Sequence, residues 1–247
     1  MTTVLRVEKL NKRFYDLRAL QDVDINVEKG ELVGIMGPNG SGKTTFLNCV
    51  TGILQSTAGR VYFHGNDITG WSTSHIHIAG ISRTFQIVQL FPEMTVLDNM
   101  IGAIQESEGS MIGRLLRISE KKECDKALEL LEFLKIAHLR NEYAKNLSYG
   151  QQKLLDLGMA LMSDPSLIML DEPLAGVNPT LGNEIMEHIL RLIDERSCTA
   201  VIVEHNAKVM LSVCDRVVVL SAGKKIADGS PMDIQKDPEV IKAYFGA

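Results

Sequence analysis

The chain has 247 residues, of which 45% are hydrophobic and 23% are charged, and its formal net charge is −5. This length and apolar content can form a full hydrophobic core without disulfides or metal. The acidic balance gives no sign of a basic nucleic-acid-binding face, and no stretch approaches the ~18 apolar residues of a membrane-spanning helix. The four cysteines form no CxxC pair, and the first ten residues do not have the pattern of a secretion signal.

In the first part of the chain apolar and polar side chains alternate, which is typical of a sheet with one solvent-exposed face. The strands predicted on this basis cover residues 4–10, 19–27 and 59–65. The stretch ELVGIMG (31–37) is more apolar and is predicted to be a buried strand. It leads into a glycine-rich loop, and residues 43–52 then predict a helix that ends at Gly52.

Residues 87–165 predict a mostly helical block, because apolar positions recur three and four residues apart. Helices are predicted over 95–104 and 119–139, the second with Ser119 and Glu120 as its start, and 105–118 is predicted to be a flexible insert.

From residue 166 the strand pattern returns in near-continuous apolar runs, as central parallel strands require. These strands are predicted over 166–172, 199–205 and 216–223, separated by helices over 181–196 and 207–214.

The glycine-rich loop GPNGSGKTT fits the pattern G-x-x-x-x-G-K-[ST] between a strand and a helix. Its glycines allow successive backbone N–H groups to point at a phosphate chain. Lys43 would place a cation against the β- and γ-phosphates, and the Thr44 hydroxyl would ligate Mg²⁺. The residues predicted to bind nucleotide here are Gly37, Pro38, Asn39, Gly40, Ser41, Gly42, Lys43, Thr44 and Thr45.

The apolar strand SLIMLDE (166–172) ends in two carboxylates. Asp171 is predicted to hold Mg²⁺ through water, and Glu172 stands where a base would polarise an attacking water.

A second anion-binding element is predicted in NLSYGQQKLLDLGMALM, where Ser148 caps a helix that runs to about Met162 and Gly150 keeps the turn open. A chain that folds its loop around ATP cannot easily bend this distant helix onto the same phosphate. We therefore expect a second subunit to supply it, with two chains arranged head to tail around two ATP molecules.

Four short motifs complete the pattern. They are Phe14 in NKRFYD, Gln86 in SRTFQ, AGVNP at 175–179 and His205 in VEHN. With these motifs the chain resembles the ATP-binding subunits of ABC transporters over nearly its whole length. LSYGQ stands where that family has its LSGGQ signature, and SLIMLDE looks like its Walker B strand.

The resemblance implies a role for each residue. Glu172, His205 and Gln86 are the expected catalytic residues, and Gln86 would also touch Mg²⁺ and report to a membrane subunit. Phe14 would stack on adenine, with neighbouring Tyr15 as the alternative. The residues expected to bind the neighbouring subunit's nucleotide are Ser148, Gly150 and Gln151.

The fold class implied is α/β: a P-loop NTPase (RecA-like) core, a mainly helical signature subdomain and an N-terminal antiparallel β region. Residues 1–247 would form a single ABC ATPase domain. Its expected parts are a nucleotide-binding core at 1–86 and 166–222, the helical subdomain at 87–165 and a C-terminal tail at 223–247.

Several stretches resemble one branch, the ATPases of branched-chain or hydrophobic amino acid uptake. They include SRTFQIVQLFPEMTVLDNM, DEPLAGVNP and DPEVIKAYFG. Tyr149 in the signature and Asn178 in AGVNP depart from the broad family and fit this branch. The resemblance implies a peripheral protein at the cytoplasmic face of the inner membrane that uses ATP and Mg²⁺. Its expected partners are a second ATPase subunit, identical or related, two permease subunits and, indirectly, an external substrate-binding protein, with no nucleic acid.

Urea import and lipopolysaccharide export are the alternative cargoes, since ATPase motifs do not specify cargo. A soluble ABC ATPase would need a long coiled coil, a duplicated cassette or a basic clamp, none of which the sequence has. The alternative of a P-loop kinase gives no role to LSYGQ or to His205. The segment at 87–100 is interpreted either as a docking surface for a membrane subunit or as helical core.

Overall fold

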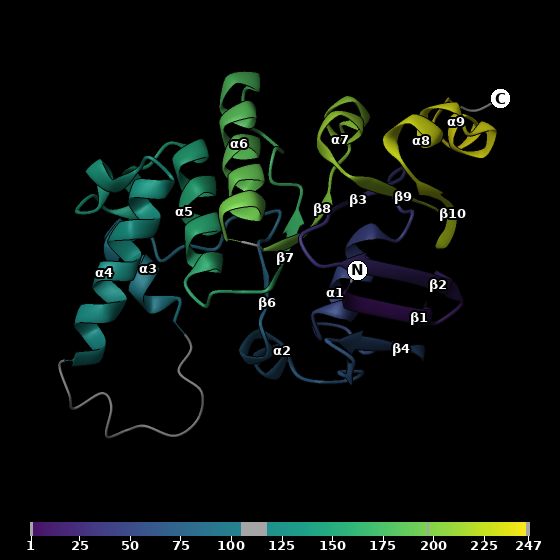
Figure 1. The fold of residues 1–247 in the computed structure, drawn as a ribbon, viewed down its shortest axis with the longest axis horizontal. Helices are drawn as coiled ribbons and strands as arrows, with labels where there is room; N and C mark the ends of the chain where they lie inside the picture. Colours follow the sequence, from purple (N-terminus) through teal and green to yellow (C-terminus); the bar gives the residue numbers. More distant parts are fainter. Residues whose placement is uncertain (1, 105–117, 197, 246–247) are drawn as a thin grey trace.

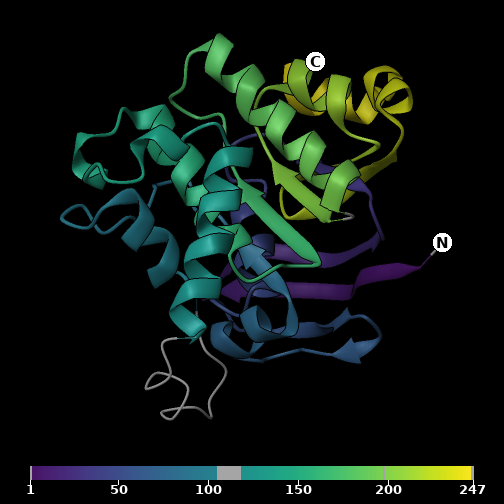
Figure 2. The ribbon, with the colours of Figure 1, turned by 60° about the vertical axis from the view of Figure 1, so that its left-hand side comes forward.

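The computed structural model describes residues 2–104, 118–196 and 198–245. They form two sheets, with helices packed around the larger one (Figures 1 and 2). The flexible insert predicted at 105–118 lies, up to residue 117, outside the described residues.

The larger sheet has six strands in the order β10-β9-β3-β8-β7-β6. Its strands are β3 (Leu32–Met36), β6 (Ile81–Arg83), β7 (Leu167–Asp171), β8 (Thr199–Val203), β9 (Arg216–Ser221) and β10 (Lys224–Gly229). All pairings are parallel except that of β10 with β9. The carboxyl ends of five strands therefore meet along one edge, the usual place for a ligand in such sheets.

The smaller sheet is antiparallel, in the order β2-β1-β4-β5. Its strands are β1 (Thr3–Phe14), β2 (Leu17–Glu28), β4 (Ala58–Phe63) and β5 (Asn66–Asp67). The three longest of them confirm the predicted alternating strands. Helix α1 (Lys43–Val50) lies between the two sheets (Figure 1) and ends two residues before Gly52, the predicted terminus.

Apart from α2, which packs beside β6 with Ile76 in the cluster shared with α1, the remaining helices cover the outer face and the far end of the larger sheet (Figures 1 and 2). They are α2 (Thr73–Ala79), α3 (Val96–Gly102), α4 (Ile118–Phe133), α5 (Tyr149–Leu161), α6 (Pro179–Arg196), α7 (Ala207–Val213), α8 (Pro231–Lys236) and α9 (Pro238–Phe245). The stretch expected as a tail thus contains β10, α8 and α9, and β10 completes the sheet.

The two faces of the larger sheet belong to two separate hydrophobic clusters. In β7, Leu167 and Met169 face the cluster shared with α1 and the smaller sheet, whereas Ile168 and Leu170 face the helices. This period of two, with every residue of the strand buried, explains why the strand reads as one continuous apolar run.

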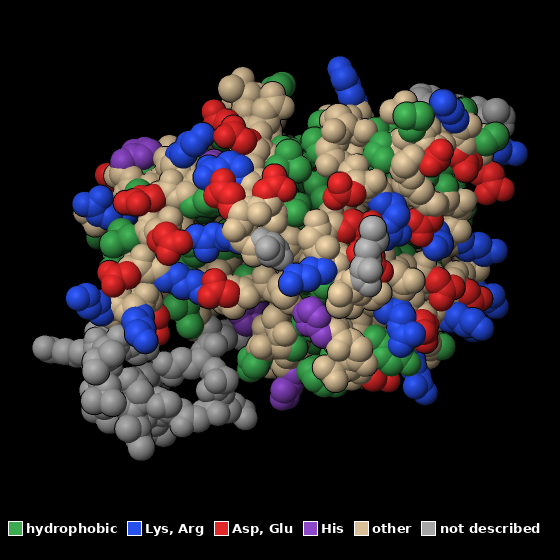
Figure 3. Space-filling model, viewed as in Figure 1, with side chains coloured by type: hydrophobic (Ala, Val, Ile, Leu, Met, Phe, Trp, Pro, Cys, Tyr) green, Lys and Arg blue, Asp and Glu red, His purple; other side chains and the backbone are tan. Residues whose placement is uncertain are grey.

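None of the helices within the described ranges is long and apolar enough to cross a bilayer. Acidic and basic side chains are interspersed over the face of the molecule drawn in Figure 3.

Candidate active site

A cleft of about 710 Å³ opens where β3, β7 and β8 end. It is lined by Phe14, Leu17, Arg18, Ala19, Asn39, Gly40, Ser41, Gly42, Lys43, Thr44, Thr45, Gln86, Glu172, His205 and Ala222. The structure therefore brings together the glycine loop, the predicted base and three residues that the motifs singled out from distant parts of the chain.

The loop backbone needs glycine at two positions. At Gly42, with φ of 106°, a side chain would begin 2.6 Å from the carbonyl oxygen of Ala19. At Gly37, with φ of 153°, it would begin 2.2 Å from the carbonyl oxygen of Leu220. Because α1 starts directly after Gly42, its unpaired N–H groups and the positive end of its dipole face the cleft.

Lys43 is buried, and its ammonium donates hydrogen bonds to the carbonyl oxygens of Gly37 (2.8 Å) and Pro38 (3.0 Å). Burial lowers its pKa, while the nearby carboxylates of Glu172 and Asp171 act in the opposite direction. The loop thus holds a cation beside its own phosphate-facing amides.

Asp171 ends β7, and Arg83 at the end of β6 donates a hydrogen bond of 2.7 Å to its Oδ2. Its Oδ1 is buried and has no hydrogen-bond partner among the described residues. A buried carboxylate oxygen without a partner matches the hard oxygen donors that Mg²⁺ prefers, as does the Thr44 hydroxyl that lines the cleft. The residues present therefore fit the predicted magnesium site.

Glu172 follows at once, in the left-handed backbone region with φ of 50°. A non-glycine residue in this conformation is uncommon and often marks a functional position. Gln86 Nε2 donates to Glu172 Oε2 (2.7 Å), and His205 Nε2 contacts Glu172 Oε1. Glu172 therefore contacts both of the other predicted catalytic residues.

The aromatic side of the cleft is formed by Phe14. Its ring is 37% exposed and lines the cleft, with Lys12 Nζ 4.9 Å from the ring centroid. Tyr15 is 97% exposed and is not among the lining residues. This geometry favours Phe14 for stacking on a base.

The signature residues do not line this cleft. Ser148 caps α5: its Oγ accepts from the N–H of Gln151 (3.4 Å), and Gln151 Oε1 accepts from the N–H of Ser148 (2.9 Å). Gly150, which we expected to keep this turn open, lies in the first turn of α5. A side chain there would begin 1.7 Å from Leu181 Cδ2 on α6, so Gly150 allows the two helices to approach.

Three buried charged residues of the site were missed from the sequence. Besides Arg83, they are Lys153, whose ammonium donates to the Gln86 carbonyl oxygen (2.9 Å), and Glu204, whose Oε1 accepts from the N–H of Leu174 (2.7 Å). Burial raises the pKa of Glu204. The only feature of the sequence that could have identified these residues is that each is a charged residue within an otherwise apolar stretch.

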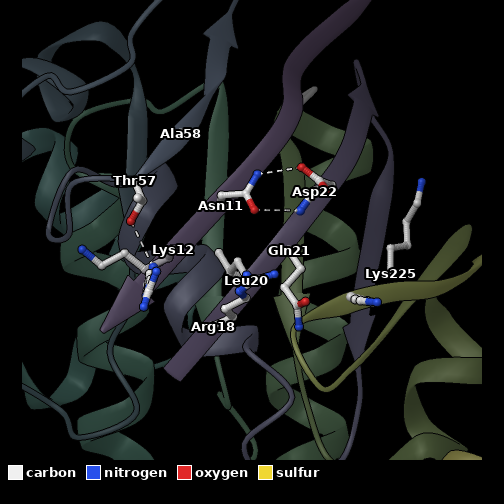
Figure 4. Close-up of a pocket in the computed structure, with 11 residues that line it drawn as sticks. Asn11, Lys12, Arg18, Leu20, Gln21, Asp22, Thr57, Ala58 and Lys225 are labelled. Atoms are coloured by element: carbon white, nitrogen blue, oxygen red, sulfur yellow. Dashed lines mark hydrogen bonds between the residues drawn. The ribbon is translucent and has the colours of Figure 1, made fainter. Parts of the chain in front are cut away.

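A second cleft, of about 620 Å³, lies over β1, β2 and the start of β10 (Figure 4). There Asn11 and Asp22 exchange two hydrogen bonds between the first two strands (2.8 and 3.2 Å). None of its lining residues comes from the glycine loop or from the ends of the parallel strands, although Arg18 borders both clefts.

A triphosphate in the first cleft would meet the α1 amides and Lys43, and a water beyond its last phosphate would meet Glu172. The fold and this cleft are those of a P-loop nucleoside triphosphatase.

Comparison with known proteins places the chain within this class. The family model described as ABC transporter matches residues 20–175, and the one described as branched-chain amino acid ATP-binding cassette transporter matches 224–247. A probable branched-chain amino acid transport ATP-binding protein LivG of Archaeoglobus fulgidus is 43% identical, over 99% of this chain and 96% of its own. The chain belongs to the ABC transporter family, as a nucleotide-binding ATPase subunit.

Two solved structures of ATP-binding cassettes are also similar. The ADP conformation of MJ1267, from an ABC transporter, has a TM-score of 0.89 and 40% identity and covers 100% of both chains. The dimeric structure of MJ0796, a bacterial ABC transporter cassette, has a TM-score of 0.79 and 27% identity over 92% of this chain and 98% of the other.

Proposed function

We propose that the chain hydrolyses ATP to drive import of branched-chain or hydrophobic amino acids. The main support for ATP hydrolysis is the position of the Glu172 carboxylate. Gln86 and His205 hold it in the same cleft as Lys43. The cargo is supported by relatives that are named for branched-chain amino acid transport over nearly the full chain.

In this proposal the adenine stacks on Phe14, and the phosphates lie along the loop amides with the last of them at Lys43. Glu172 orients and polarises the attacking water, because its carboxylate is fixed by two neighbours and faces the cleft. His205 and Gln86 keep that carboxylate in place while charge develops on the phosphate.

The Thr44 hydroxyl and Asp171, with Gln86 beside them, would hold Mg²⁺. The ion would neutralise charge on the β- and γ-phosphates. Arg83 positions Asp171 for this role through the 2.7 Å bond to its other oxygen.

The active assembly in this proposal is a pair of ATPase subunits. Ser148 is exposed at the N-terminus of α5, and neither it nor Gly150 lines the chain's own cleft, so this helix end is available to a nucleotide held by a neighbour. The dimeric MJ0796 cassette supports an assembly of this kind. A related second subunit fits the branch better than an identical one.

The permease subunits would dock on the first part of the 87–100 segment. Ile87 is 79% exposed and Phe91 is 55% exposed, whereas Val96 and Met100 are buried. The first half of the segment therefore fits a docking surface, and the second half fits helical core. This contact would hold the protein at the cytoplasmic face of the inner membrane, where an external substrate-binding protein acts through the permeases.

Reconstitution with the permease subunits and the substrate-binding protein in liposomes tests the proposal. ATP-dependent uptake of leucine and valine is expected, with none for the Lys43→Ala subunit. Uptake of urea in place of amino acids would overturn the cargo, and uptake that is unaffected by Lys43→Ala would overturn the site.

A further inference from the structure

Helix α5 carries two buried charged side chains that packing alone does not require. Lys153 is 6% exposed and Asp156 is 8% exposed, and both lie on the side of the helix that faces the sheet. Lysine and aspartate are almost never this deeply buried unless they are paired, because removing a charge from water is costly. Their partners therefore indicate what the two residues do.

Both partners belong to the catalytic segments. The Lys153 ammonium donates to the carbonyl oxygens of Gln86 (2.9 Å) and Glu172 (3.4 Å), so one side chain joins the segment after β6 to the segment after β7. The Asp156 carboxylate accepts a hydrogen bond from the backbone N–H of Phe85, and burial raises its pKa to about 7. The backbone of the residues that form the catalytic cluster is thus held by α5.

The first turn of the same helix contacts the segment that leads into α6. The Tyr149 ring lies 2.9 Å from where a side chain at Gly176 would begin, and Gly150 packs on Leu181. The Lys153 ammonium also lies 5.6 Å from the centroid of the Tyr149 ring. The end of α5 that carries Ser148 is therefore fixed to the rest of the chain at several points.

We propose that Lys153 is a positioning residue through which α5 couples the two nucleotides of the assembled pair. At its N-terminus the helix meets the partner's nucleotide through Ser148. About 8 Å along the axis, given the rise of an α-helix, Lys153 holds Gln86 and Glu172 at this chain's own nucleotide. When the partner's ATP fixes the helix end, the same helix fixes the catalytic carboxylate.

This inference rests on the proposed function, because it assumes that Ser148 contacts the nucleotide of a second subunit. It adds that the two sites depend on one another through a rigid element with contacts at both ends. Lysine suits the role because its ammonium has three donors, and two of them serve the two backbone carbonyls.

The test compares Lys153→Met, which keeps the length of the side chain without its donors, with Lys153→Arg, which restores donors. Lys135→Met, at an exposed lysine after α4, is the matched control. ATP affinity, kcat, the Hill coefficient for ATP and amide hydrogen exchange are measured on the assembled pair of subunits.

For Lys153→Met we expect unchanged ATP affinity, kcat lower by about 10- to 100-fold, a Hill coefficient near 1 and faster exchange at the amides of residues 85–87, 172 and 174. Lys153→Arg should recover a large part of kcat and of the cooperativity. If Lys153 only stabilised the fold, its loss would raise amide exchange throughout the chain. Changes in kcat and cooperativity would then always be accompanied by that general rise.

Wild-type kcat and cooperativity in Lys153→Met, with Glu172→Gln inactive, would overturn the coupling and leave the proposed function intact. Activity retained in both Glu172→Gln and Lys43→Ala would instead refute the proposed site itself. If Lys153→Met does not fold, Lys153→Gln, which is too short to reach both carbonyls, decides the same comparison.

Discussion

The backbone conformation of Glu172 determines where its carboxylate points. Its backbone is in the left-handed region, and its N–H donates to the Val203 carbonyl oxygen (2.9 Å), so the chain turns sharply as it leaves β7. The turn directs the carboxylate toward the cleft, where Gln86 and His205 hold it.

Replacing Glu172 by Gln should lower kcat for ATP hydrolysis by at least about 100-fold, because the amide keeps the shape of the side chain but does not accept a proton. ATP affinity should be unchanged, since Lys43 and the loop remain. Steady-state kinetics and equilibrium dialysis measure the two quantities, and a wild-type rate would refute the assignment of Glu172.

Asp156 predicts a pH dependence of stability. Burial raises its folded-state pKa from 3.8 to about 7, so its protonated form contributes stability that is full below about pH 4 and is lost as the pH rises through about 7. Lys153 and the Phe85 N–H act in the opposite direction and limit the effect.

Asp156→Asn keeps an acceptor for the Phe85 N–H and removes the titration. We expect the stability of the variant relative to wild type to increase as the pH rises between those limits. Urea unfolding across the range measures the difference, and parallel stability curves for the two proteins would contradict the prediction.

At the scale of elements, the loop before α3 is braced by Asn99, which is fully buried. Its side chain accepts from the N–H of Phe91 (2.8 Å) and donates to the carbonyl oxygens of Phe91 (3.1 Å) and Thr95 (2.9 Å). One buried amide thus fixes the backbone of Phe91, one of the two exposed residues that we propose as the permease contact.

Asn99→Leu should destabilise the fold by about 2–3 kcal/mol, because it leaves the Phe91 N–H without its partner and removes the amide's hydrogen bonds to the Phe91 and Thr95 carbonyl oxygens. The free energy of unfolding in urea measures the loss. Asn141→Leu, at an exposed asparagine after α4, is the control and should change stability little.

Phe91→Ser should leave ATP hydrolysis by the isolated subunit unchanged and reduce transport by the complete complex, because the exposed ring lies outside the cleft. The control is Ile78→Ser on α2, which removes an equally exposed apolar side chain elsewhere. Equal transport by both variants would argue against docking at this segment.

The elements that the sequence predicts best are those whose side-chain pattern is set by burial. Strands β3, β7, β8 and β9 read clearly because both faces of the sheet are covered. Strand β6 has three residues and β10 is a polar edge strand, so neither produces a pattern. Lys153 was missed for a related reason: its partners are two backbone carbonyls, which no sequence motif displays.

For the whole molecule, the separation of Ser148 from the cleft predicts complementation between damaged chains. In pairs formed by two copies of this chain, Ser148→Ala and Lys43→Ala subunits should each be nearly inactive alone, since every composite site then carries a lesion. A mixture should recover activity, because a mixed pair has one site with both lesions and one with neither. Activity of the mixture no higher than that of its components would indicate that the signature acts within its own chain.

The most direct test of the account is the structure of the Glu172→Gln protein trapped with ATP. We predict each triphosphate between Lys43 of one subunit and the α5 N-terminus of the other, with Ser148 Oγ and the Gly150 N–H in hydrogen-bond contact with the γ-phosphate. A trapped assembly in which Ser148 of every subunit lies far from all bound triphosphates would contradict it.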